Sequence, residues 1–297
     1  MISYNLKDLE VPKIHQLLLG AIGPRPIALA STIDENGVSN VSPFSFFNVF
    51  SANPPIVVFS PAKNGRTLTQ KDTYNNLKKV PEVVINVVNY SIVQQISLSS
   101  SPYPPDVDEF VKAGFEKIPS EMIKPFRVKE SPVQLECKVN QIIELGDGGA
   151  AGNLVICEVL KIHISEEVLS ETGQIDQKKI DLVARMGGNW YCRANGDSLF
   201  EIEKPLTTIG IGFDSFPQEI LNNAFLNKNE MALLASVESI PDETEVNEYK
   251  LLELSELFIT LEKNPNELKK KLYQNASNLI AENKIIEAWK TILSFND

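Results

Sequence analysis

The sequence is poor in the residues that build metal sites and disulfide frameworks. Its 297 residues include only two histidines, His15 and His163, and three cysteines, Cys137, Cys157 and Cys192, with no Cys-x-x-Cys pair. A structural zinc site needs about four such ligands close together. An odd, widely spaced set of cysteines does not form a disulfide framework. We therefore expect no metal, and reduced thiols that are mostly buried.

Long apolar runs are also missing, and we expect no secretory leader. The richest apolar stretches, such as residues 83–88, have the length of a strand, whereas a membrane-spanning helix needs roughly 20 consecutive apolar residues. The first residues carry Asp8 and Glu10, not a basic start followed by an apolar core. Apolar residues make up 43% and charged residues 23% of the chain, as in an ordinary globular protein. We expect a cytoplasmic protein without a membrane partner.

Arginine is missing from the last third of the chain. Residues 201–297 hold 9 basic and 17 acidic side chains, whereas residues 1–200 hold 19 basic and 22 acidic ones. The net charge of −11 therefore comes mostly from the last third. Nucleic-acid binding requires a basic patch that neutralises phosphates, so no nucleic-acid partner is expected. A small anionic ligand in the first two thirds needs only a local cluster of Arg and Lys.

Short apolar runs separated by turns dominate residues 1–200. Residues 27–33 and 38–50 flank Asp34-Glu35-Asn36-Gly37, which is a hairpin signal. Pro43, inside the second run, indicates an edge strand or a bulge. Further strands are expected at 56–59, 83–88, 133–140 and 153–165, and helices at 67–79 and 108–113. These elements predict a mainly β, antiparallel barrel with a few inserted helices.

The last third has helical signals instead. Ser215-Phe216-Pro217-Gln218 has the pattern of a capping box, and Asn264-Pro265 is another helix start. Ile285, Trp289 and Ile292 follow the spacing of one helix face. We expect a barrel domain over residues 1–200, a linker over 201–214 and an all-helical extension over 215–297.

Four segments of the barrel region carry groups suited to ligand binding. Gly23-Pro24-Arg25-Pro26 gives a rigid start to a strand. Residues 39–48 replace apolar alternation with hydroxyls, amides and aromatic rings. Residues 66–73 place two cations and several hydroxyls at a helix start, where free N–H groups favour a phosphate. The paired glycines within residues 185–191 permit close approach to a ligand or subunit.

Each of these segments also fits a purely structural role. Residues 23–26 are compatible with an ordinary turn, and residues 39–48 with a bulged edge strand whose aromatic rings fill the core. Residues 66–73 are compatible with a capped, solvated helix start. The paired glycines fit a simple turn. Only the order of the segments along the chain favours a binding site.

In this order the motifs resemble the flavin reductase-like family of FMN-binding split barrels. The resemblance covers roughly residues 15–195. It is carried by Gly-Pro-Arg-Pro at 23–26, Ser-Pro-Phe-Ser-Phe-Phe-Asn at 42–48, Pro54-Pro55, Lys71-Asp72-Thr73 and Leu135-Glu136-Cys137. It implies a six-stranded Greek-key split barrel that forms a homodimer, with FMN at the subunit interface. It also implies electron transfer from NADH or NADPH to flavin.

The resemblance also implies roles for individual residues. Around the isoalloxazine ring it places Pro43, Phe44, Ser45 and Asn48; near the ribityl phosphate it places Ser60, Arg66, Thr67, Lys71, Asp72 and Thr73; and Arg185 and Tyr191 close the site. The chemistry belongs to the flavin, so no catalytic side chain is expected. Cys157 departs from the family pattern, in which Gly often precedes the Glu-Val pair.

We therefore expect an NAD(P)H:flavin oxidoreductase. The chain has no Gly-x-Gly-x-x-Gly fingerprint of a dedicated nicotinamide domain and no Gly-x-Ser-x-Gly of a hydrolase, so NAD(P)H would stack transiently on the flavin. One alternative is a non-enzymatic FMN-binding electron carrier of the flavoredoxin kind. Another is a split barrel that binds a different ligand, such as haem.

Two parts of the chain are compatible with more than one role. Strand alternation in residues 153–165 places Leu160, Ile162 and Ile164 on one face and His163 on the other. His163 either approaches the flavin or the dimer seam, or is only a polar-face residue of its strand. The helical extension is expected to pack on the barrel or across the dimer and to take no part in catalysis.

Overall fold

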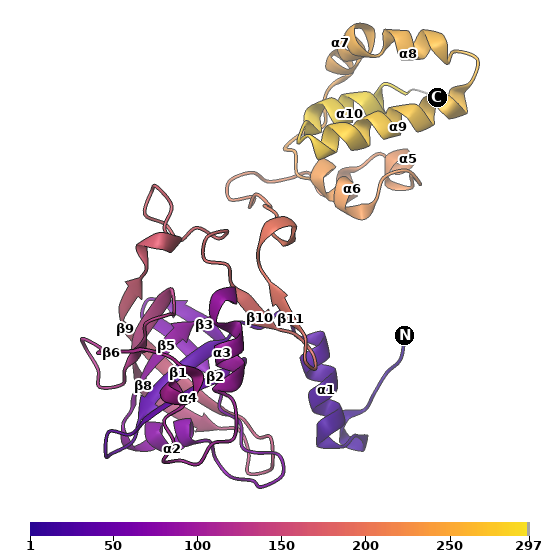
Figure 1. The fold of residues 1–297 in the computed structure, drawn as a ribbon. Coiled ribbons are helices and arrows are strands. Elements are labelled where there is room, and N and C mark those ends of the chain that lie inside the picture. Colours follow the sequence, from indigo (N-terminus) through magenta and orange to yellow (C-terminus); the bar gives the residue numbers. More distant parts are fainter. Residues whose placement is uncertain (296–297) are drawn as a thin grey trace. The chain divides into compact units, whose positions relative to one another are not determined.

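The computed structural model describes residues 1–295, and the chain divides into two compact units, Met1–Phe200 and Glu201–Asp297. Figure 1 shows that all the strands belong to the first unit and that the second unit is helical. Each unit has a hydrophobic core of its own. No helix in residues 1–295 combines the length and the apolar character needed to cross a membrane.

A seven-stranded antiparallel sheet in the order β2-β1-β5-β8-β9-β4-β3 forms the first unit. Its strands are β1 (Ala28–Ile33), β2 (Ser39–Phe44), β3 (Phe47–Ala52), β4 (Pro55–Phe59), β5 (Glu82–Val87), β8 (Val133–Glu144) and β9 (Asn153–Ile164). The edge strands β2 and β3 are joined by only Ser45 and Phe46, so the sheet must curl until its two edges approach each other. Because β2 and β3 do not pair, the barrel stays split. The expected split barrel is confirmed, but the sheet has seven strands and not six, because the run 38–50 forms two strands.

The hairpin between β1 and β2 forms at the predicted turn. The Asp34 side chain accepts hydrogen bonds from the backbone N–H groups of Asn36 and Val38, at 2.9 and 2.7 Å. Gly37 has φ +84°, a conformation that costs glycine little. Small antiparallel pairs add β6 (Lys117–Ile118) with β7 (Arg127–Val128), and β10 (Val183–Arg185) with β11 (Tyr191–Arg193).

Four α-helices accompany the sheet: α1 (Val11–Ala21), α2 (Asp72–Lys79), α3 (Val93–Leu98) and α4 (Glu109–Ala113). The prediction of a helix over residues 67–79 was wrong at its start. The side chain of Asn64 accepts the backbone N–H groups of Arg66 and Thr67, and Leu68 has φ +60°. These local hydrogen bonds hold residues 64–69 in a turn, so the helix begins only at Asp72.

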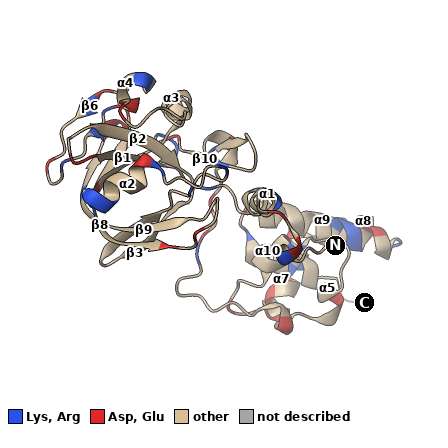
Figure 2. Ribbon diagram, turned by 90° about the horizontal axis from the view of Figure 1, so that it is seen from below, with Lys and Arg blue, Asp and Glu red and all other residues tan. Residues whose placement is uncertain are grey.

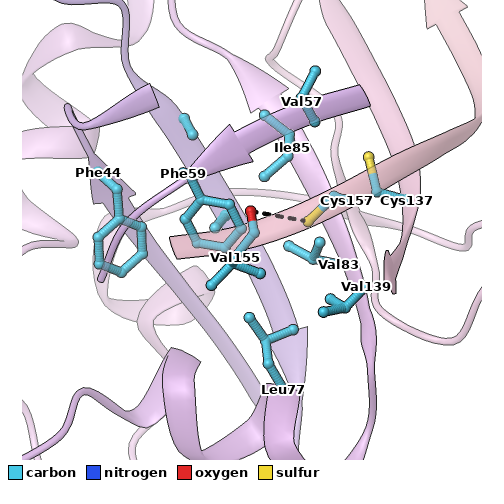
Figure 3. Packing of buried hydrophobic residues seen from close by; sticks show 12 residues of the cluster. Phe44, Val57, Phe59, Leu77, Val83, Ile85, Cys137, Val139, Val155 and Cys157 are labelled. Carbon is cyan, nitrogen blue, oxygen red and sulfur yellow. Dashed lines mark hydrogen bonds between the residues drawn. The ribbon is translucent and has the colours of Figure 1, made fainter. Parts of the chain in front are cut away.

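Aromatic and branched side chains fill the interior of the barrel (Figure 3). The rings of Phe44 and Phe59 lie 5.5 Å apart between centroids, and Leu77 of α2 packs on the same cluster. Cys137 and Cys157 are free and fully buried there. Burial raises the pKa of Cys137 to about 12, so this thiol is unreactive at neutral pH.

The second unit consists of α5 (Gln218–Leu221), α6 (Lys228–Leu234), α7 (Glu243–Glu253), α8 (Ser255–Thr260), α9 (Pro265–Ala281) and α10 (Ile285–Leu293). Trp289 is fully buried at its centre, and its indole N–H donates to the Leu234 carbonyl at 2.8 Å. The predicted face of α10 is confirmed, because Ile292 is also buried and Ile285 packs against the same cluster.

One helix start in this unit is confirmed and another was wrong. Asn264 caps α9 by accepting the N–H of Glu267. The capping box at Ser215 does not form; Phe213–Ser215 is a short 3-10 turn, and α5 begins at Gln218 without a side-chain cap. Pro217 disfavours the helical conformation at Phe216, which is extended here, so a helix cannot run on from Ser215.

We predict that Leu272→Ala destabilises the second unit by about 2–5 kcal/mol, because it empties a fully buried site. In a Trp190→Phe background, the fluorescence of Trp289 reports unfolding of this unit, because these are the two tryptophans of the chain. The control Leu251→Ala changes an exposed leucine and should shift stability by less than about 0.5 kcal/mol. Equal losses in the two variants would contradict this assignment of the core.

Candidate functional site

The corner between β2 and β3 brings together the residues expected at the isoalloxazine ring. Pro43 pairs with Leu29 on the edge strand β2, whose other side is unpaired, so its missing N–H breaks no ladder bond. Ser45 is half-buried at the corner and Asn48 is exposed on β3. Phe44 differs, because its ring is buried in the core. Only its backbone remains available to a ligand at the edge.

The start of α2 carries the positive charge expected near a phosphate. Arg66 and Lys71 are exposed, and no carboxylate within residues 1–295 lies within 4.0 Å of either. Lys71 occupies the N-cap position, and no side chain there accepts a hydrogen bond from the first N–H groups of α2. An uncapped helix start beside two unpaired cations fits an anionic group. Asp72, half-buried in the first turn, is the only acidic residue in that turn.

The hydroxyl groups of the candidate site already have partners within the protein. Thr73 is buried and donates to the Asn40 side-chain oxygen at 2.9 Å. The hydroxyl of Thr67 lies 2.7 Å from that of Thr69, and the Ser60 hydroxyl accepts the backbone N–H of Asn153 at 3.0 Å. In this structure these three residues shape the loop before α2 and attach it to the sheet.

Sequence reasoning missed two buried residues beneath this region. Asn40 donates through its side-chain amide to a carboxylate oxygen of Glu109 at 3.0 Å, and the other oxygen accepts the backbone N–H of Val41 at 3.3 Å. Burial raises the pKa of Glu109, and the nearby Asp72 carboxylate adds to the effect. Glu109 follows the N-cap residue Asp108. In the sequence it therefore looks like an ordinary solvent-exposed acidic residue at the start of a helix.

The hairpin β10–β11 attaches to the start of β1. Arg185 and Arg25 exchange two backbone hydrogen bonds of 2.9 Å. The Arg185 guanidinium lies 4.5 Å from the centroid of the Tyr191 ring, within cation–π range. Because Ala28 pairs with Phe44, the hairpin lies toward the end of β2 that leads into the corner. The predicted residues of the β2–β3 corner and those of the β10–β11 hairpin therefore lie toward the same end of β2.

The Arg25 side chain holds the backbone around this hairpin. Its guanidinium donates to the carbonyls of Leu19 and Met186, both at 2.9 Å, and to that of Ile22. The carbonyls of Leu19 and Ile22 lie at the C-terminal end of α1, and the carbonyl of Met186 lies in the turn after β10. One buried side chain thus joins two peripheral segments of the barrel unit.

Residues 21–181 match the family model described as flavin reductase like domain. This span is more than half of the chain. The protein belongs to the flavin reductase-like family. A curated relative from Halalkalibacterium halodurans is 35% identical over 203 residues, which span 68% of this chain and 95% of the relative.

Solved structures of similar proteins agree with the fold of this flavin reductase-like chain. Component B of the nitrilotriacetate monooxygenase from Bacillus cereus matches with a TM-score of 0.63 and 30% identity, over 68% of this chain and 98% of its own. A protein from Shewanella frigidimarina with a split barrel domain matches with a TM-score of 0.58 and 25% identity, over 69% and 100%.

His163 of this flavin reductase-like protein lies in a buried ionic cluster. Its Nε2 is 2.7 Å from a carboxylate oxygen of Glu136, which is fully buried and also accepts the backbone N–H groups of Glu121 and Met122 at 2.9 and 2.7 Å. Burial by itself would raise the pKa of Glu136, but these hydrogen bonds and His163 together lower it. The contacts support the strand role for His163.

We predict that Glu136→Gln lowers the free energy of unfolding by about 1–3 kcal/mol at pH 7, because buried N–H groups lose a charged acceptor. The folded-state pKa of Glu136 is lowered, so its stabilisation is present above the unfolded pKa of about 4.3 and is lost as pH falls through the folded value. Urea unfolding should therefore show the two proteins converging below about pH 4. A gap that stays constant over this range would argue against the cluster.

Proposed function

We propose that this protein binds FMN and acts in the cytoplasm as an NAD(P)H:flavin oxidoreductase. The observation that carries the proposal is the uncapped start of α2, preceded in the chain by the unpaired cations Arg66 and Lys71, together with an edge strand that contains Pro43. Membership of the flavin reductase-like family supports the same reading. FMN, when bound, supplies the chemistry of accepting hydride and passing on electrons.

The residues present fit the two chemically different ends of FMN. Arg66, Lys71 and the first N–H groups of α2 would hold the phosphate through charge-assisted hydrogen bonds. Ser45, Asn48 and the backbone at Pro43 offer polar groups to the edge of the ring system. The Asp72 carboxylate would partly offset the positive charge of these groups. The other predicted residues, Ser60, Thr67 and Thr73, would lie near the phosphate, and their hydroxyls also form hydrogen bonds within the protein.

Arg185 and Tyr191 would close the site near the end of β2 that leads into the corner. Their stacked arrangement holds the guanidinium against a flat aromatic surface, and the Arg185 side chain also donates to the Gly188 carbonyl at 2.8 Å. These contacts orient the pair before any ligand arrives, which lowers the entropic cost of binding. NADH or NADPH would approach the exposed face of the ring as a transient electron donor.

We predict that Arg66→Ala with Lys71→Ala weakens FMN binding at least about tenfold while riboflavin, which lacks the phosphate, loses little. The matched control is Lys78→Ala with Lys79→Ala, which removes the same charge at the opposite end of α2, where both lysines face carboxylates. Fluorescence titration with both flavins measures the effect. Equal losses for FMN and riboflavin would place the phosphate elsewhere.

Oxidation of NADH and of NADPH in the presence of FMN tests the activity itself. Steady-state turnover with either donor supports the oxidoreductase. A protein that purifies yellow with FMN but gives no turnover would instead be an electron carrier. A colourless protein that takes up no FMN would overturn the proposal and favour a barrel for another ligand.

We also propose that the protein is a homodimer, because apolar side chains continue the core face of the sheet beyond the barrel interior. Ile162 pairs with Leu135, which pairs with the buried Ile85, and cross-strand partners share a face. Since β4 pairs with β9 only up to Glu158, Ile162 lies beyond that cover and is 54% exposed. On the edge strand β3, Val49 pairs with the buried Val57 yet is 66% exposed.

Further apolar residues of the barrel unit are also exposed. Phe50 on β3 and Leu160 and Ile164 on β9 are also exposed, and none of the residues of α1 is buried within a single chain. Exposed apolar surface of this extent is typical of an interaction site. A second copy would cover the β3 edge as well, which otherwise remains open to unwanted pairing. The expected interface is of the obligate kind, at about 2,000 Å² or more.

We predict that Val49→Asp with Ile162→Asp converts the dimer to a 33.0 kDa monomer with a reduced FMN content, since burying a carboxylate in an apolar interface is costly. The control Val111→Asp alters an equally exposed valine on α4 and should leave both properties unchanged. Sedimentation velocity measures mass, and absorbance measures bound flavin. A wild-type monomer that keeps FMN on dilution would refute the dimer.

A further inference from the structure

The second unit has no counterpart in the two similar structures, which match over 98% and 100% of their own length but over only 68% and 69% of this chain. It is therefore an addition to the barrel, and none of the predicted flavin contacts lies in it. Figure 1 shows α7 and α8 as an outer layer of this unit, over α9 and α10. The net negative charge of the unit and several of its exposed apolar side chains lie in or beside this layer.

The negative charge of the unit is concentrated in this layer. Residues 238–262 contain eight acidic side chains and one basic one, a net charge of −7, whereas all of residues 201–297 carry −8. The single cation, Lys250, is engaged within the unit, because it donates to the Ser294 carbonyl at 2.9 Å and lies 4.1 Å from the Phe258 ring centroid. The layer therefore presents an almost purely acidic surface.

Large apolar side chains lie among these acids instead of in the core. Leu251, Leu252 and Ile259 are 73%, 79% and 77% exposed. The core-facing side of the same helices is already filled, since Val246 and Leu254 are buried there. These three exposed side chains are thus not part of the core of the unit. Exposed apolar surface with a polar rim marks an interaction site.

Helical spacing places acids beside these apolar residues. Glu248 precedes Leu251 and Leu252 by three and four positions on α7, and Glu256 precedes Ile259 by three positions on α8, so each pair shares a helix surface. No Lys or Arg within residues 1–295 pairs with Glu248, Glu256 or Glu262, whereas Glu245 pairs with Lys290 at 3.4 Å. Unpaired carboxylates around an apolar strip attract a ligand of opposite charge.

We propose that this face, defined by Glu248, Leu251, Leu252, Glu256, Ile259 and Glu262, docks a basic amphipathic helix of a partner protein. An amphipathic helix supplies an apolar stripe for the leucines and isoleucine, while its flanking Lys and Arg meet the carboxylates. The three apolar residues come from the last turns of α7 and α8. The docking face is independent of flavin binding, and it would attach the barrel to its partner.

The test uses the full-length chain and a fluorescent peptide of about 18 residues, built from Leu at helical spacing with Lys at the other positions. Fluorescence anisotropy should show binding of this peptide and none of a peptide with Glu in place of Lys. Glu248→Lys with Glu256→Lys and Glu262→Lys should weaken binding at least tenfold. Leu252→Ser with Ile259→Ser should do so at unchanged charge. Binding should also weaken as salt increases.

Matched controls separate this face from general attraction to an acidic protein. Glu166→Lys with Glu167→Lys and Glu171→Lys makes the same charge change on exposed residues of the barrel unit, and Leu206→Ser with Ile209→Ser removes two exposed apolar residues before α5. Both should bind the peptide like wild type. Equal weakening in the controls, no binding at all, or a change of oligomeric state in Leu252→Ser with Ile259→Ser would overturn the proposal.

Two further measurements keep the interpretation clear. The fluorescence of Trp289 should be unchanged in every variant, because the substitutions lie on the outside of the unit. FMN content should also be unchanged, so that failure of the docking proposal is distinguishable from failure of the proposed flavin site. A variant that loses FMN together with peptide binding would contradict the independence of the two surfaces.

Discussion

The barrel unit depends on one constraint, the two-residue connection between its own sheet edges. Ser45 and Phe46 join β2 to β3, although these strands stand at opposite ends of the sheet order. A flat seven-stranded sheet would separate its edges by roughly 29 Å at about 4.8 Å per strand, which two residues cannot span. The sheet must therefore curl. Pro43 lies on the edge strand β2, where its missing N–H breaks no hydrogen bond to a neighbouring strand.

The same constraint concentrates polar groups at one place. Side chains of an edge strand are not covered by a neighbouring strand, so the corner leaves Ser45 and Asn48 accessible beside α2. Buried polar residues then support the exposed ones. Asn40 ties Thr73 to Glu109. The basic residues within α2 lie in its last turn (Figure 2), and Lys71 immediately precedes its first turn. Its last turn is neutralised by carboxylates, whereas its start is not.

Most strands were predictable from the sequence because their information is local. Alternation in residues 133–140 and Asp34-Glu35-Asn36-Gly37 each specify an element within a few residues. The start of α2 was not predictable, because Leu68 adopts φ +60°, which takes the chain out of the helical conformation before Asp72. The role of Glu109 depends on a partner 69 positions away in the chain, and no local pattern encodes such a pairing. The resemblance named candidate site segments, but it did not indicate which of their side chains are buried in the core, as Phe44 is.

The Arg25 side chain has a mechanical consequence. Helix α1 has no buried residue of its own, so apolar packing within the chain does little to fix its position. Its C-terminal carbonyls are instead held by the same guanidinium that binds the turn after β10. The helix and the hairpin turn are thus linked through one pivot, and a force that displaces α1 is passed directly to the segment between Arg185 and Tyr191.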